Sequence, residues 1–561
     1  MKETAQRILF SFLILALAVT ACSRPTRQTG SQPTVPPDTA SPNASPSSFP
    51  SASPEVVSTQ SGSVRGIQNG ETMAYLGIPF AAPPLGDLRW KPPVPPQPWT
   101  DERIADTFAP PCPQMDDENQ VIGSEDCLYL NIWTPLDAAS ASNLPVMVYI
   151  HGGGNTKGSA VMERNGVRMY DGQQLAARGQ AVVVTLQYRL GALGFLVHPA
   201  LAAESEHGVS GNYGLLDQIA ALQWVQANIA NFGGDPEKVL LFGESGGAVD
   251  TCMLLVSPLA NGLFARALME SGACVAPPAQ ERAAEGQAFV SAAGCEANAD
   301  PLACLRSLDM SQIVSAVDTT PIQGGVVTMA FGANTDGYLL PQEPLAALES
   351  GQFNQVPFVI GSNANEMLPL APPMTQELYE AAVHKSLDSI QPGLAEEALA
   401  LYPVGDGPSE YESPRHAFAA LVSDAQFTCN ARAIAGAAAQ GGAPVYRYFF
   451  SKTLDSPLQR RLGSFHGLEL FYVFQHIQDM DNYTASNADL SLQRGLLGYW
   501  TRFAETGNPN GSGAPEWLLY DPTRDNYLEL GTVIQAGAGL RSAQCDFWDR
   551  VSQIRQVEFS E

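Results

Sequence analysis

The chain has 561 residues, 45% hydrophobic and 16% charged, which is enough apolar material for a large buried core. Its 30 basic and 57 acidic side chains give a formal net charge of −27, and no basic run interleaved with aromatic residues is present. This balance excludes a nucleic-acid partner, and we expect an acidic globular protein.

Residues 1–21 predict an export signal peptide. Lys2 and Arg7 flank the start of an apolar run from Ile8 to Ala21, which is too short to span a bilayer comfortably. The small residues before Cys22 resemble a bacterial lipobox, in which the cysteine becomes the lipid-modified first residue of the mature chain. We therefore expect an exported protein of the cell envelope, anchored to a membrane through lipids on Cys22. The alternative is ordinary cleavage near Ala21 and secretion.

Residues 22–54 predict a disordered tether behind this cysteine. The segment is rich in Ser, Pro and Thr and has almost no apolar side chain, so it cannot bury enough surface to become ordered. No internal repeat and no second linker of this kind follows. We therefore expect residues 55–561 to form a single domain.

The domain alternates short apolar runs with helix-like stretches. Residues 56–66 and 72–78 alternate as antiparallel edge strands do, and residues 215–229 are helix-like. Buried strands are expected at 128–133, 144–150, 181–187, 239–242, 356–360 and 445–450. This order predicts an α/β fold, with a large, mostly parallel sheet covered by helices on both faces. In such sheets, functional sites form in loops at the carboxyl ends of strands.

The segment Gly243-Glu-Ser-Gly-Gly247 follows one such run and precedes a stretch, 248–255, that can continue as a buried helix. A serine at this junction is typical of a nucleophile elbow, and glycines beside it leave room for the sharp turn. A Gly-rich turn without function is the alternative, so the assignment of Ser245 depends on matching residues elsewhere.

Three such matches follow other strands. Gly153 and Gly154 come directly after the run 144–150, and with Gly246 we expect their N–H groups to form an oxyanion hole. Glu366 follows the run 356–360 and is the expected acid. For the base, the chain order serine, acid, histidine leaves His384, His416, His466 and His476, of which we choose His466 because it lies in the connection after 445–450. We place His384 and His416 in helical, surface-like sequence and His476 inside a helix pattern.

Together these residues predict ester hydrolysis. His466 would take the proton of Ser245 as it attacks the ester carbonyl, while Glu366 would hold the imidazole in the productive tautomer. Water would then release the acyl group by the same route. Nothing in this chemistry requires a metal or a cofactor.

Nine cysteines are present, and eight remain after Cys22. In an exported chain without Cys-x-x-Cys or Cys/His clusters, an even number favours disulfides over a metal site. Sequence alone leaves the pairing open, although Cys112–Cys127 and Cys295–Cys304 would close short loops.

The chain resembles type-B carboxylesterases, the family that includes cholinesterases. The resemblance spans about 55–561 and is carried by ordered motifs: Ser124-Glu-Asp-Cys-Leu-Tyr-Leu-Asn-Ile-Trp-Thr-Pro135, His151-Gly-Gly-Gly154, Asn212-Tyr-Gly-Leu-Leu-Asp-Gln218, Phe232-Gly-Gly-Asp-Pro236, Gly243–Gly247 and Phe503-Ala-Glu-Thr-Gly-Asn-Pro-Asn510. It implies the α/β-hydrolase fold and a Ser245, Glu366 and His466 triad. It also implies an Arg89–Glu125 salt bridge.

The same resemblance implies three disulfides, Cys112–Cys127, Cys295–Cys304 and Cys429–Cys545, and leaves Cys252 and Cys274 as a further candidate pair. The chain departs from cholinesterases in the loop from 113 to 126, which has no aromatic residue to hold a quaternary ammonium. We therefore expect small or moderately hydrophobic esters as substrates rather than choline esters. The alternatives are a lipase-like acylglycerol hydrolase and a non-catalytic adhesion or scaffold protein of the same fold.

Overall fold

A computed structural model describes residues 55–138, 142–317, 322–323, 326–327, 331–407 and 410–558. The predicted signal peptide, Cys22 and the tether lie outside the described residues, and the domain boundary near residue 54 stays a prediction. In the part of the chain that is described, no helix is both long and apolar enough to cross a membrane. The same residues contain no group of three or more His, Cys, Asp or Glu side chains arranged to hold a metal ion.

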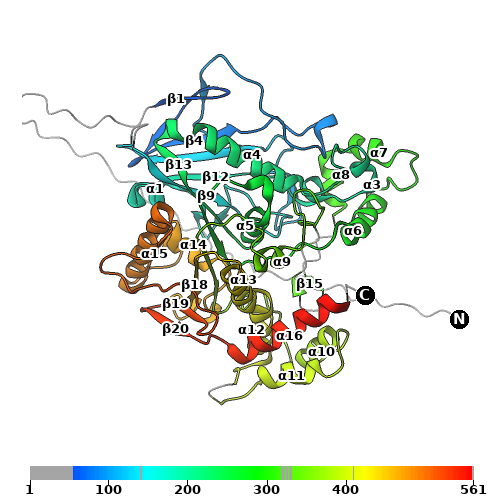
Figure 1. The fold of residues 1–561 in the computed structure, drawn as a ribbon, viewed down its shortest axis with the longest axis vertical. Helices are drawn as coiled ribbons and strands as arrows, with labels where there is room; N and C mark the ends of the chain where they lie inside the picture. Colours follow the sequence, from blue (N-terminus) through cyan, green and yellow to red (C-terminus); the bar gives the residue numbers. More distant parts are fainter. Residues whose placement is uncertain are drawn as a thin grey trace, which may run out of the picture. The chain divides into compact units, whose positions relative to one another are not determined.

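An eleven-stranded sheet runs through the molecule (Figure 1). Seven neighbouring strands, from β19 to β12 in the sheet order, are mutually parallel, and the remaining four include antiparallel pairs at both ends of the sheet. In sheet order the strands are β20 (Ile534–Ala538), β19 (Asn526–Leu530), β18 (Val445–Phe450), β17 (Phe358–Asn363), β14 (Arg266–Glu270), β13 (Gly234–Glu244), β9 (Leu144–Ile150), β12 (Val182–Leu186), β8 (Tyr129–Pro135), β4 (Thr72–Pro79) and β3 (Ile67–Asn69).

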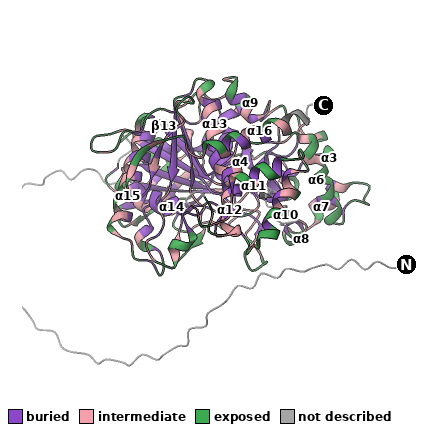
Figure 2. Ribbon diagram, turned by 90° about the horizontal axis from the view of Figure 1, so that it is seen from below, coloured by how far each residue is buried: buried purple, intermediate pink, exposed green. Residues whose placement is uncertain are grey.

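Both faces of the sheet are buried. Along β9, Val146, Val148 and Ile150 pack into one hydrophobic cluster, whereas Met147 and Tyr149 pack into another on the opposite face. This alternation follows from the two-residue period of a strand, and it explains why the buried strands are continuously apolar. Figure 2 shows the strands as the buried centre of the molecule and the helices exposed on their outward sides.

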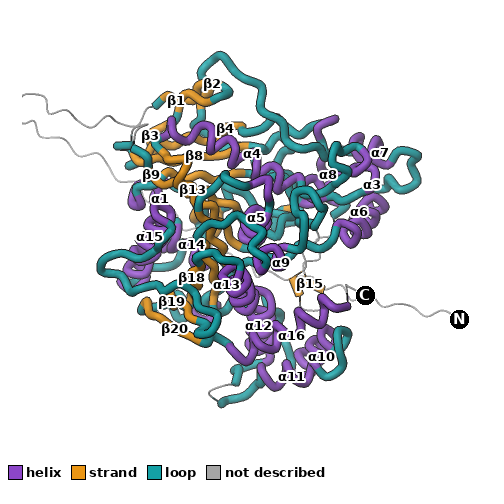
Figure 3. Tube along the Cα trace, in the orientation of Figure 1, coloured by secondary structure: helices purple, strands orange, loops and turns teal. Residues whose placement is uncertain are grey.

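Different helices supply the two covering layers. The first cluster contains residues of α4 (Tyr213–Asn228), α5 (Gly246–Val256) and α13 (Cys429–Gln440). The second contains residues of α1 (Gln173–Gly179), α14 (Leu468–Val473) and α15 (Asn487–Thr506). The predicted α/β architecture is therefore confirmed, with the mostly parallel sheet between helical layers (Figure 3).

A third hydrophobic cluster joins helices that lie beyond the sheet layers (Figure 1). These helices are α10 (Gln376–Leu387), α11 (Leu394–Leu401), α12 (Pro414–Ser423) and α16 (Ser542–Glu558). The remaining helices are α2 (Gly191–Phe195), α3 (Pro199–Ala203), α6 (Ala279–Ala292), α7 (Pro301–Ser307), α8 (Met310–Ser315) and α9 (Pro344–Glu349). The remaining strands are β1 (Val56–Thr59), β2 (Gly62–Arg65), β5 (Arg103–Ile104), β6 (Gln114–Met115), β7 (Val121–Ile122), β10 (Glu163–Arg164), β11 (Val167–Arg168), β15 (Ile322–Gln323) and β16 (Val326–Val327).

The sequence prediction is wrong in part at the edges. Residues 56–66 are not one strand but the hairpin β1–β2, which forms a separate three-stranded sheet with β5. The run 128–133 is a buried strand, but β8 pairs antiparallel with both of its neighbours. Strands β14, β19 and β20 were not expected, because their short and partly polar sequences give a weak apolar signal.

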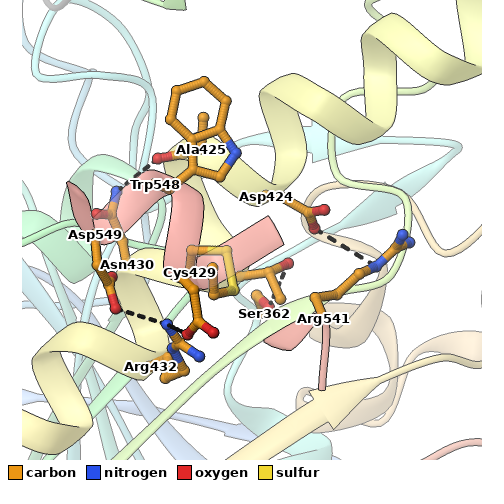
Figure 4. Close-up of a disulfide and its surroundings, with 12 residues drawn as sticks. Ser362, Asp424, Ala425, Cys429, Asn430, Arg432, Arg541, Trp548 and Asp549 are labelled. Carbon is orange, nitrogen blue, oxygen red and sulfur yellow. Dashed lines mark hydrogen bonds and ion pairs between the residues drawn. A yellow bond between two sulfur atoms is a disulfide. The ribbon is translucent and has the colours of Figure 1, made fainter. Parts of the chain in front are cut away.

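The described residues contain four disulfides: Cys112–Cys127, Cys252–Cys274, Cys295–Cys304 and Cys429–Cys545. The last joins residues 116 apart, the start of α13 and the helix α16. Figure 4 shows ion pairs beside it, in which Arg432 reaches Asp549 and Arg541 reaches Asp424. The Arg89–Glu125 salt bridge is confirmed as well: Nη2 and Nε of the arginine bind the two carboxylate oxygens at 2.5 and 2.8 Å.

Candidate active site

Ser245 stands alone between β13, which ends at Glu244, and α5, which begins at Gly246. Its backbone has φ 57° and ψ −122°, a left-handed conformation that costs free energy for a residue with a side chain. The turn is held by Ser245 N, which donates to Glu270 O at 2.9 Å, and by Val249 N, which donates to Ser245 O at 3.0 Å. A Cβ on Gly247 would collide with the carbonyl oxygen of Ile150. The sharp strand-to-helix turn predicted from the glycines is therefore present.

The glycine loop after β9 lies against this turn. A Cβ built on Gly152 would be 2.9 Å from Cβ of Ser245, and one built on Gly246 would be 2.8 Å from the amide nitrogen of Gly154. Gly153 and Gly154 have φ of 109° and 62°, so their peptides adopt orientations that residues with side chains avoid. Gly246 is the first residue of α5, where N–H groups have no partner within the helix. The glycine loop and the start of α5 thus lie against each other beside Ser245.

Glu366 and His466 are brought together from segments 100 residues apart. Nδ1 of His466 lies 2.7 Å from Oε2 of Glu366, and His466 N donates to Glu366 O at 3.2 Å. The other carboxylate oxygen accepts a hydrogen bond from Asn363 N at 2.6 Å. The Glu366 side chain is fully buried and that of His466 is 22% exposed. The carboxylate is therefore fixed from both sides, and only the imidazole reaches a surface accessible to solvent.

The opposite edge of the imidazole faces a residue that sequence reasoning missed. Nε2 of His466 lies 3.2 Å from Oε1 of Glu244, the residue directly before Ser245. Burial alone would lower the pKa of His466, but the charges of Glu244 and Glu366 raise it to about 9. In the structure, the imidazole thus lies between two carboxylates and beside the elbow. The position of Glu244 within the elbow motif is the signal that could have identified it.

Two further buried acids extend this group. Glu270, at the end of β14, accepts a hydrogen bond from Trp500 Nε1 at 3.2 Å, and Glu469 accepts one from the Asn363 side chain. Burial, together with the neighbouring carboxylates, raises the pKa of both Glu270 and Glu469. We therefore expect these two side chains to remain protonated up to a higher pH than an exposed glutamate does. The pattern of apolar and polar residues along the sequence does not predict that Glu270 and Glu469 are buried near His466.

The other candidate histidines have partners of their own. His384, in α10, binds Asp388 at 2.7 Å, and His416, in α12, contacts Ser413 Oγ at 2.8 Å. His476 is not inside a helix, as its sequence pattern predicted, but lies between α14 and a short 3-10 turn, with Nε2 3.1 Å from Asp171 O. Of the four candidates, His466 is the one that the structure pairs with Glu366.

Known proteins resemble the chain along most of its length. The model of the carboxylesterase family matches residues 53–548. A fumonisin B1 esterase of Sphingopyxis macrogoltabida is 36% identical over 86% of this chain and 87% of its own length. A liver carboxylesterase of Sus scrofa is also 36% identical, over 88% of this chain and 93% of its own. Among solved structures, a PNB esterase has 34% identity and a TM-score of 0.75, covering 88% of this chain and 99% of its own.

Proposed function

Because the chain belongs to the carboxylesterase family and is a carboxylic ester hydrolase, we propose that it works through an acyl-enzyme formed on Ser245. In this proposal His466 is the general base and then the general acid, and Glu366 orients it. The observation that carries the proposal is the 2.7 Å contact between His466 and Glu366 at the edge of the elbow that contains Ser245.

The first half of the reaction is acylation. Ser245 Oγ attacks the ester carbonyl carbon while Nε2 of His466 takes the hydroxyl proton, and the alcohol leaves with that proton as the tetrahedral intermediate collapses. Glu366, which accepts from Nδ1, keeps the free electron pair on Nε2 and stabilises the imidazolium. In the second half, water attacks the acyl carbon and gives a proton to His466. As the second tetrahedral intermediate collapses, the bond between the acyl carbon and Ser245 Oγ breaks, His466 returns the proton to Ser245 Oγ, and the carboxylic acid is released.

The oxyanion hole in this proposal consists of the N–H groups of Gly153, Gly154 and Gly246. The observation that supports this assignment is the contact of the glycine loop with Gly246, the first residue of α5. Removing one donor of this kind costs about 3–4 kcal/mol of transition-state stabilisation in other serine hydrolases. Main-chain donors suit the purpose because their orientation is set by the fold and costs nothing at the moment of reaction.

For the substrate we propose small or moderately hydrophobic carboxylic esters. The loop between Cys112 and Cys127 has no aromatic side chain to bind a quaternary ammonium. The relatives include proteins named fumonisin B1 esterase, cocaine esterase and PNB esterase, and these names do not point to one common ester. We also propose that the enzyme is exported and anchored to a membrane through Cys22, as residues 1–22 predict.

Labelling with a fluorophosphonate tests the nucleophile. We expect the adduct on Ser245, and we expect Ser245→Ala to keep the fold while turnover of p-nitrophenyl esters falls by at least about 10⁴-fold. Hydrolysis near the parental rate in that variant would refute the assignment. Rates over esters of increasing acyl length separate a short-chain esterase from a lipase-like enzyme, whose rate would rise with chain length. An adhesion protein would not be labelled at all.

A further inference from the structure

Asp250 is a fully buried carboxylate on α5, five residues after Ser245. Its Oδ1 accepts a hydrogen bond from Asn155 Nδ2 at 2.8 Å, and its Oδ2 accepts one from Gln218 Nε2 at 2.6 Å. Asn155 belongs to the glycine loop after β9, and Gln218 belongs to α4, the helix beside α5 (Figure 1). One carboxylate therefore ties the helix that follows Ser245 to the loop that contains Gly153 and Gly154.

Asn155 directly follows Gly154 and is held on several sides. Its side-chain oxygen lies 3.0 Å from the hydroxyl of Tyr188, and its carbonyl oxygen accepts from Gly191 N at 2.6 Å. The same hydroxyl of Tyr188 lies 2.9 Å from His151 O, and the rings of Tyr188 and His151 stack at 4.5 Å. Tyr188 thus contacts the residues that precede and follow the three glycines. Of these contacts, the bond to Asp250 is the one that connects the loop to α5.

A buried acid at this position is costly. Burial raises the pKa of Asp250 to about 7. The hydrogen bonds from Asn155 and Gln218 favour the ionised form and lower the pKa, but their effect is smaller than that of burial. Both of these partners are neutral amides, so the carboxylate receives hydrogen bonds without a compensating positive charge from them. An apolar side chain would fill the space between α4 and α5 at lower cost, but it could not hold the Asn155 amide. This comparison points to a role in positioning the loop.

We propose that Asp250 is a positioning residue for the oxyanion hole, which holds the Gly153 and Gly154 amides against Ser245 and Gly246 by binding Asn155. The proposal rests on the proposed function of those amides. Gly246 and Asp250 lie one turn apart on the same helix, so α5 supplies one oxyanion donor and also anchors the other two. The three donors then move as one body, and their spacing does not depend on the flexibility of a glycine loop.

The expected signature is a loss in the transition state without a loss in substrate binding. Asp250→Ala leaves Asn155 Nδ2 without its acceptor, so the loop is no longer fixed to α5. We expect kcat to fall by about 10- to 100-fold and KM to change by less than about threefold, because the donors act mainly on the developing oxyanion. Affinity for a trifluoromethyl ketone, which forms an oxyanion with the serine, should fall in parallel with kcat.

Four variants serve as comparisons. Asp250→Asn should keep most of the parental kcat, because its amide oxygen can still accept the hydrogen bond from Asn155. The Oε1 of Gln218 has no hydrogen-bond partner in the structure, so the Gln218 amide can turn and accept a hydrogen bond from the new amide group. Asn155→Gly keeps the left-handed backbone, which has φ 57°, but removes the side chain. It should lose as much as Asp250→Ala, and the double variant should lose no more than either single one. Thr134→Val, in β8, removes the buried hydrogen bond that Thr134 Oγ1 donates to Phe232 O at 2.9 Å and should leave kcat unchanged.

Unchanged kcat and inhibitor affinity in Asp250→Ala would overturn the proposal, as would a loss that appears only in KM. Equal losses in Thr134→Val would show a general effect of stability and would also overturn it. If Asp250→Ala does not fold, Asn155→Gly and Asp250→Asn carry the same test. Fluorophosphonate labelling of Ser245 separates the two hypotheses: labelled parent enzyme with a normal Asp250→Ala variant refutes only the positioning role, whereas an active Ser245→Ala variant refutes the proposed function.

Discussion

Glu244 should set the pH at which the enzyme loses activity. His466 acts as a base only when neutral, so activity falls as the pH drops through its pKa, and any anion that raises this pKa moves the fall to higher pH. Glu244 Oε1 is 3.2 Å from Nε2, whereas Glu366 binds the opposite nitrogen and Glu469 contributes from farther away. Glu244→Gln keeps the shape of the side chain and removes one of these charges.

The magnitude follows from the distance. Two unit charges 3.2 Å apart interact by about 5 kcal/mol at an effective dielectric constant of about 20, which is an upper limit for this pair. The rise in the pKa of His466 from 6.5 to about 9 corresponds to about 3 kcal/mol after the opposing effect of burial. Of the charges that raise this pKa, that of Glu244 contributes most. In Glu244→Gln, the fall of kcat/KM on the acid side should therefore move to lower pH, by at most about 4 pH units, which is the upper limit of about 5 kcal/mol expressed as a pKa change.

The assay is the pH profile of kcat/KM for a p-nitrophenyl ester, which reports ionisations of the free enzyme. The position of the acid limb is read separately from the maximal rate, so a lower rate in the variant does not obscure the shift. Glu349→Gln removes an exposed carboxylate at the end of α9 and should leave the limb in place. An acid limb that stays at the parental pH in Glu244→Gln, or moves upward, would refute the electrostatic reasoning.

The remaining predictions concern stability. Burial raises the pKa of Asp250 from 3.8 to about 7, so the native state binds a proton that the unfolded state has lost, and stability falls by up to about 4 kcal/mol as the pH rises across this interval. Asp250→Asn should therefore gain melting temperature over the parent at pH 8 more than at pH 5; equal differences would contradict this. Replacing Cys429 and Cys545 with serine should cost about 4–5 kcal/mol in denaturant unfolding, because their bond closes a loop of 116 residues, and an unchanged midpoint would contradict this.

Several strands of the fold could be predicted from the apolar runs in the sequence. Residues 144–150 and 445–450 form β9 and β18 with the predicted bounds, because continuous apolar runs between helices have few other places in a globular protein. Strand β14 escaped prediction because Arg266–Glu270 is short and begins and ends with charged residues. It becomes a strand by pairing with β13 and β17, which are distant in sequence from each other.

The elbow was also predictable, because the serine and its flanking glycines form one short motif directly after an apolar strand. The crowding that requires glycine at position 247 comes from Ile150 O at the end of β9 and is seen only in the fold. His466 was found through chain order and through its place after a strand. The family resemblance gave three of the disulfides, but the pairing of Cys252 with Cys274 was left open until the two residues were seen 5.6 Å apart at Cα.

The sequence by itself determined most of the buried strands, the elbow motif and the identities of the paired acid and base, because each follows from a local apolar run, from a short motif or from residues placed directly after strands. Only the tertiary structure placed Glu244 against His466, buried Glu270 and Glu469 beside them, and joined Asp250 to Asn155 across 95 residues. Such contacts depend on which strand ends and helices become neighbours. The sequence does not show whether a carboxylate is exposed to water or buried. Burial depends on the tertiary fold, and it determines the pKa of the carboxylate and the role that it can play.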